Sequence, residues 1–112
     1  MISKALTAIA DTGTREYPPA PFHPGDAYPE YRGELAPQAN PVYAGVRELF
    51  VSLGLDSANF GSPRWNPLGE IIRPGDRVLI KPNLVRHYHP NGLDARAIVT
   101  HGSVLRAVCD YV

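Results

Sequence analysis

The distribution of proline constrains this 112-residue chain more than any other feature of its sequence. Proline fixes φ and lacks a backbone N–H, so neither a helix nor a central strand can persist where prolines are dense. Seven of the twelve prolines fall in one stretch, at positions 18, 19, 21, 24, 29, 37 and 41. We therefore predict an extended segment over residues 14–40, called the Pro/Tyr segment below, and a folded body over 41–112.

Aromatic side chains alternate with these prolines, at Tyr17, Phe22, Tyr28 and Tyr31. A solvated spacer has no need of aromatic side chains, so we predict that the Pro/Tyr segment lies extended over the body of the protein. Two alternatives are a loop that closes over a ligand and a strip that binds a partner protein.

Two helices are predicted from capping residues and apolar periodicity. Asn40 followed by Pro41 is typical of a helix start, and Gly54 suits the left-handed residue that follows a helix end. Apolar side chains recur at helical spacing between these signals, which predicts a helix over 41–53. A second helix is predicted over 101–112, where one face carries Val104, Leu105, Val108 and Val112.

Two strands are predicted, at residues 4–10 and 78–81. The continuous run Val78-Leu79-Ile80 lies between a turn at 74–76 and Pro82, and suits a strand covered on both faces in a parallel sheet. The order strand, helix, strand, helix then predicts an α/β fold with a partial parallel sheet.

A sheet of only two strands would be marginally stable. Two strands and two helices leave both sheet edges open and supply little core. We therefore expect residues 1–112 to be the N-terminal part of a single, incomplete α/β domain that needs the remainder of its chain or a homo-oligomer for stability. The alternative is a naturally short protein stabilised by self-association.

Residues 75–85, GDRVLIKPNLV, resemble the hallmark segment of the family called domain of unknown function 362, in which a glycine–aspartate turn precedes a strand ending in Ile-Lys-Pro-Asn. Residues 100–108 resemble the threonine-containing start of that family's next helix, with Gly102 and Ser103 where many members have proline and an acidic residue. The resemblance implies a longer α/β protein of no agreed activity, linked to cell-surface glycan metabolism. Some members carry cysteine-rich iron–sulfur segments, which the single Cys109 does not supply, so we expect no iron–sulfur cluster here.

A ligand site is predicted at the end of the second strand. In open parallel sheets, ligands bind beyond the carboxyl ends of the strands. Lys81 and Asn83 lie at such an end, and Thr100 and Ser103 lie in the first turn of the next helix, where free N–H groups attract anions. These residues are therefore candidates to bind a phosphate or carboxylate. Alternatively, they only cap the helix and fix the loop.

Three histidines are candidate acid/base groups: His87, His89 and His101. His87 and His89, with Asp94, are also weak candidates for metal ligation. They form no ligand set of diagnostic spacing, so we predict no metal site. The catalytic residues, and whether the chain is an enzyme, are left undetermined by the sequence.

Composition excludes several classes of function. The chain has eleven Lys and Arg residues and eleven Asp and Glu residues, and its basic residues form no run. This balance of charge argues against nucleic-acid binding. No stretch approaches the ~20 apolar residues that span a membrane, and a lone cysteine suits a reducing compartment. We expect a cytoplasmic enzyme or ligand-binding domain for a small anionic molecule. The alternative is a non-catalytic protein-binding or assembly module that uses the Pro/Tyr segment.

Overall fold

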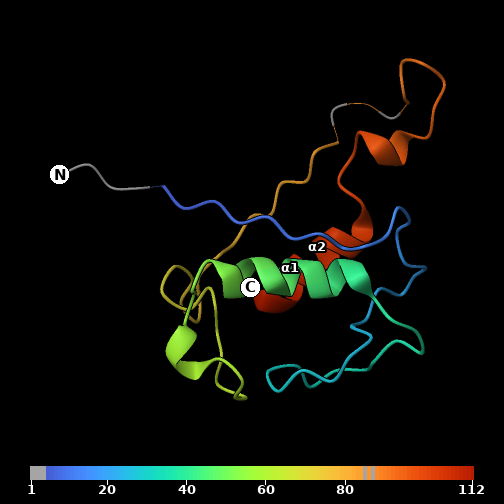
Figure 1. The fold of residues 1–112 in the computed structure, drawn as a ribbon. Coiled ribbons are helices and arrows are strands. Elements are labelled where there is room, and N and C mark those ends of the chain that lie inside the picture. The colour runs from blue at the N-terminus through green and yellow to red at the C-terminus, as the bar shows by residue number, and fades with distance from the viewer. Residues whose placement is uncertain (1–4, 85, 87) are drawn as a thin grey trace.

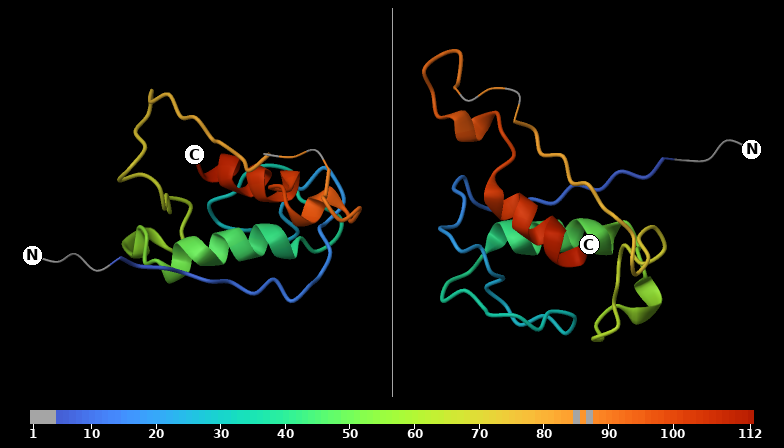
Figure 2. Two further views of the ribbon diagram at one scale, coloured as in Figure 1. Left: turned by 90° about the horizontal axis from the view of Figure 1, so that it is seen from above. Right: turned by 180° about the vertical axis from the view of Figure 1, so that it is seen from behind.

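The computed structural model describes residues 5–84, 86 and 88–112. Two α-helices pack against each other, and the rest of the described chain runs around them as irregular structure (Figures 1 and 2). The elements in chain order are α1 (Pro41–Ser52), the 3-10 helix η1 (Ser57–Asn59), the 3-10 helix η2 (Ala95–Ala97) and α2 (Gly102–Tyr111).

No strand is present among the described residues, so the predicted α/β fold with a parallel sheet is wrong. Residues 5–10 and 77–82 do run extended (Figure 1), but their backbone groups make no hydrogen bonds to other described residues. A strand exists only when a neighbouring strand pairs with its N–H and C=O groups. The apolar run at 78–80 favours extended backbone, but no segment among the described residues forms a hydrogen-bonded ladder with it.

The first predicted helix is confirmed: α1 begins at the predicted residue 41 and ends at 52, one residue before the predicted end. Asn40 is its N-cap, and its side-chain oxygen accepts from the N–H of Tyr43 at 3.0 Å. The Asn40 amide group also donates to the carbonyls of Phe22 and His23, at 3.2 and 2.9 Å. One side chain therefore starts the helix and fastens the Pro/Tyr segment to it.

The second predicted helix is confirmed within one residue at each end. Its N-cap is His101, whose Nδ1 accepts from the N–H of Ser103 at 3.2 Å. An imidazole nitrogen replaces the hydroxyl or carboxylate oxygen that usually satisfies the first free N–H groups of a helix. Neither Thr100 nor Ser103 has this capping role.

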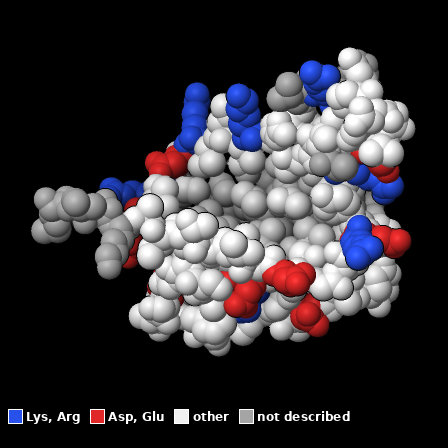
Figure 3. Space-filling model, turned by 45° about the horizontal axis from the view of Figure 1, so that its top comes forward, with Lys and Arg blue, Asp and Glu red and all other residues white. Residues whose placement is uncertain are grey.

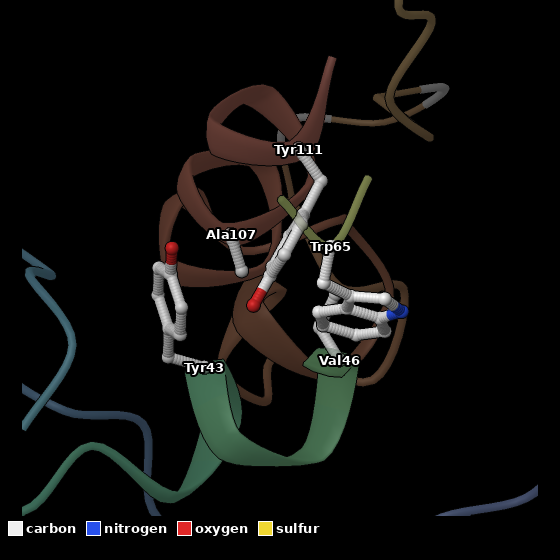
Figure 4. Close-up of a cluster of buried hydrophobic side chains, with 5 residues drawn as sticks. All are labelled: Tyr43, Val46, Trp65, Ala107 and Tyr111. Carbon is white, nitrogen blue, oxygen red and sulfur yellow. The ribbon is translucent and has the colours of Figure 1, made fainter. Parts of the chain in front are cut away.

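Aromatic side chains form most of the core between the two helices (Figure 4). Tyr111 of α2 lies between Tyr43 of α1 and Trp65, with ring centroids 6.1 and 5.7 Å apart. Ala107 is completely buried, and its small side chain lets α2 approach α1 closely. The Trp65 indole N–H donates to the carbonyl of Leu55 at 2.9 Å, which fixes the loop after α1.

The Pro/Tyr segment packs on this core, which confirms that it lies over the body of the protein. The rings of Tyr28 and Tyr31 are each 6.0 Å from the ring of Tyr43. Pro24 is among the most deeply buried side chains. The prolines therefore prevent secondary structure, while the tyrosines supply the contact area that holds the segment in place.

A buried ion pair joins the Pro/Tyr segment to α1. The Arg47 Nε lies 2.6 Å from the Glu30 carboxylate, and both side chains are at most 14% exposed. The Tyr111 hydroxyl donates to the same carboxylate at 2.9 Å. The Arg47 guanidinium also lies 4.4 Å from the Tyr28 ring centroid and 5.0 Å from that of Trp65. Three parts of the chain thus converge on one guanidinium.

These contacts predict a pH window for stability. Burial acts to raise the pKa of Glu30, but hydrogen bonds from Arg47 and Tyr111 outweigh it and lower that pKa. Burial and the neighbouring carboxylates raise the pKa of Tyr43 and of Tyr111 well above the ordinary tyrosine range. A lowered carboxyl pKa gives stability that is lost as the pH falls, and a raised phenol pKa gives stability that is lost at high pH.

We therefore expect the free energy of unfolding, measured by urea denaturation, to be highest between about pH 5 and pH 10. Glu30→Gln should remove much of the decline below about pH 5, because the amide does not titrate. Glu70→Gln, at an exposed position, should leave the acid limb of the profile unchanged. An acid limb of wild-type steepness in Glu30→Gln would show that this carboxylate does not set the window.

Candidate functional site

Two of the four residues predicted to bind an anion lie together. The N–H of Asn83 donates to the Thr100 hydroxyl at 2.9 Å, and the N–H of Thr100 donates to the Asn83 carbonyl at 2.9 Å. The Asn83 amide group donates to the carbonyl of Ile98 at 3.1 Å. The predicted proximity of these residues is confirmed, and their polar groups join the extended segment to the residues before α2.

The other two residues lie in different surroundings. Lys81 is exposed and lines an open depression of about 470 Å³ with Asn83 and Leu84. Ser103 is fully buried, and its hydroxyl oxygen lies 2.9 Å from the His101 Nδ1. A bound phosphate or carboxylate could reach Lys81 but not Ser103 in this conformation. Anion binding by Lys81, Asn83 and Thr100 stays a prediction.

The surroundings of His101 indicate a structural role and not a catalytic one. Its ring stacks on Tyr17 with centroids 4.0 Å apart and meets the Phe22 ring edge-on at 5.4 Å. Because its Nδ1 accepts from the Ser103 N–H, the neutral ring carries its proton on Nε2. The Ser103–His101 pair has the spacing of a nucleophile and its base, but a fully buried hydroxyl cannot attack a bound substrate.

The remaining histidine candidates are placed only in part. His87 lies outside the described residues, and the His89 Nδ1 accepts from the N–H of Asn91 at 3.1 Å. Asp94 is paired with Arg96, whose hydrogen bonds lower the pKa of the Asp94 carboxyl. Within the described part of the chain, no group of three or more His, Cys, Asp or Glu residues could hold a metal ion.

A cavity of about 800 Å³ lies beside the first turns of α1 and α2, and no sequence motif indicates it. Its size suits a small organic molecule. Its charges balance, however, and Asp94 already pairs with Arg96, so it does not select an anion. The lining residues are Thr12, Thr14, Arg15, Glu16, Tyr17, Val42, Asp94, Arg96 and Val104.

The extended residues 77–84, called the edge segment below, present a different kind of surface. Arg77, Val78, Leu79 and Lys81 are all exposed, and Ile80 is partly covered. Leu79 is 91% exposed, against 44% for Val78, so the backbone and side chains of this segment lie largely open to solvent. In the face shown in Figure 3, Lys and Arg side chains project along the upper margin of a hollowed region.

The molecule also exposes more surface than a compact protein of its mass. Its accessible area is 8,424 Å², whereas a folded 12.2 kDa monomer exposes about 6,100 Å². Its radius of gyration is 15.6 Å, against about 13 Å for a compact chain of this length. The excess, roughly 2,300 Å² on one chain, is larger than the roughly 800 Å² that each partner buries in a standard protein–protein interface.

Comparison with protein-family models, curated proteins and solved structures finds no match to the chain. The resemblance to domain of unknown function 362, strong over residues 75–112 and weaker over 41–75, therefore rests on the sequence alone and stays a prediction. Neither of the α-helices in the described part of the chain has the length and apolar character needed to cross a bilayer.

Proposed function

We propose that this chain is a non-catalytic protein-assembly module whose edge segment binds an extended polypeptide strand. One observation carries the proposal: residues 77–82 run extended, their backbone groups make no hydrogen bond to any described residue, and Leu79 among them is 91% exposed. A row of unpaired N–H and C=O groups is the template that an added strand uses. The docking element is placed on the edge segment and not on the Pro/Tyr segment, because Tyr28 and Tyr31 of the latter pack on α1.

Hydrogen bonds flank the residues available for pairing, which supports strand binding over a flexible loop. Before the edge segment, the N–H of Arg73 donates to the Asp76 carboxylate at 2.8 Å and closes a turn. Within its C-terminal part, the N–H of Asn83 donates to the Thr100 hydroxyl and fastens this end to the residues before α2. A segment that is already held extended loses less conformational freedom when a strand pairs with it. Pro82 has no N–H, so pairing is expected to end at Lys81.

A proline at position 79 tests this proposal. Leu79→Pro removes one N–H from the ladder, but Leu79 makes no hydrogen bond in the free protein, so the fold should be retained. We expect a ten-residue peptide of alternating Thr and Val to protect the amides of 77–81 from hydrogen exchange. Leu79→Pro should weaken its binding about tenfold in calorimetric titration.

Leu79→Ala is the matched control, because it shortens the same side chain and keeps the N–H. It should retain most of the peptide affinity. Equal binding by the proline and alanine variants, or peptide binding without amide protection at 77–81, would rule out strand addition at this edge.

A further inference from the structure

The edge segment also carries information about its partner. We infer that the strand it binds has acidic side chains facing Arg77 and Lys81, and that this strand is not the edge segment of a second copy. The inference rests on the strand-binding function proposed above and names the chemistry of the partner at that same site.

The edge segment and the residues just after it carry only positive charges, and these charges have no acidic partners among the described residues. Residues 77–86, RVLIKPNLVR, contain three cationic side chains and no acidic one. Arg77, Lys81 and Arg86 are exposed, and within the described part of the chain none of them has an ion-pair partner. Asp76 lies before the segment, in the turn, where its carboxylate accepts from the N–H of Arg73.

Strand geometry fixes where complementary charges must lie. Side chains alternate between the two faces of a strand, so Arg77, Leu79 and Lys81 share one face, with the two cations about 13 Å apart. The partner residue opposite each cation lies on that same face, where opposite charges stabilise and like charges destabilise the pair. The matching strand is therefore apolar opposite Leu79 and acidic two positions to either side.

The same rule disfavours pairing between two copies of the edge segment. An antiparallel pair centred on Leu79 places Arg77 of each copy opposite Lys81 of the other, and a parallel pair in register places each cation opposite itself. Both arrangements bring like charges together. Shifting the antiparallel register by one or two residues avoids this, but every such shift brings either the turn at 74–76 or Pro82 into the ladder and shortens the pairing.

Three peptides that differ only at these two flanking positions test the inference on the full chain. The peptides share one apolar centre and carry Glu, Gln or Lys at both flanks. We expect affinity to fall in the order Glu, Gln, Lys, with about tenfold between the extremes. Added salt should reduce the advantage of the Glu peptide, because the charges are exposed.

The charge-reversed variant Arg77→Glu/Lys81→Glu should reverse this order. The control Arg32→Glu/Arg64→Glu changes the net charge equally at exposed positions outside the edge segment and should keep the wild-type order. A reversal in both double variants would show a non-specific effect of net charge and overturn the inference.

The outcomes separate the two proposals. If all three peptides bind equally and protect the amides of 77–81, the charge inference fails while strand binding stands. If none protects these amides, the proposed function fails and the inference with it. If sedimentation shows self-association that Leu79→Pro abolishes, the partner is a second copy, and the inference is overturned.

Discussion

Replacing Arg47 with alanine is expected to lower the free energy of unfolding by about 3–5 kcal/mol, because it leaves the Glu30 carboxylate buried without its counter-charge. Glu30 is only 6% exposed at its side chain, so water cannot replace the lost guanidinium. The variant also loses the contacts of that guanidinium with the rings of Tyr28, Phe60 and Trp65. Since small domains have about 5–15 kcal/mol of stability in total, a loss of this size is a large fraction of it.

Urea denaturation followed by far-ultraviolet circular dichroism measures this loss. Arg64→Ala is the matched control, because Arg64 is exposed and the change should stay within about 0.5 kcal/mol. The double variant Glu30→Gln/Arg47→Met should recover part of the loss, since it leaves no unpaired buried charge. If Arg47→Ala unfolded at the same urea concentration as Arg64→Ala, the ion pair would not hold the Pro/Tyr segment on α1.

The sequence revealed the apolar side of α1 but not the side that contacts Arg47. Helical spacing placed Val42 and Val46 on the core-facing stripe, and both are buried. Tyr43, only 1% exposed, and Arg47 lie on the neighbouring face, which the Pro/Tyr segment covers. Periodicity detects apolar residues, whereas a buried guanidinium depends on a carboxylate seventeen positions away. Local sequence contains no signal for that pairing.

The sheet was predicted wrongly for the same reason, because strand pairing also depends on residues far apart in the sequence. Helical spacing and the signals from proline, glycine and capping residues act within a few residues, and they correctly predicted α1 and α2, whereas the strand predicted at 78–81 is wrong. A strand also needs a partner, and the apolar run at 78–80 does not say where that partner lies. Chain order did bring Asn83 close to Thr100, as predicted, because one loop separates them. The large cavity combines residues 12–17, 94, 96 and both helices, which no motif connects.

Replacing Trp65 with alanine is expected to cost about 3–5 kcal/mol of unfolding free energy, because it opens a cavity at the junction of both helices and the loop after α1. Trp65 is 4% exposed, and its ring meets those of Phe60 and Tyr111 edge-on, at 5.3 and 5.7 Å. The variant also leaves the carbonyl of Leu55 without its indole donor. Circular dichroism is the appropriate measurement, because the chain has no other tryptophan to report by fluorescence.

Two further variants test whether the loss of stability in Trp65→Ala arises in the core. Leu79→Ala removes an apolar side chain that is 91% exposed and should change the unfolding free energy by less than about 0.5 kcal/mol. Because the Arg47 guanidinium lies 5.0 Å from the Trp65 ring, the Arg47→Ala/Trp65→Ala double variant should lose less than the sum of the two single losses. Additive losses would mean that the two side chains stabilise the loop and the Pro/Tyr segment independently, and that the guanidinium does not couple them.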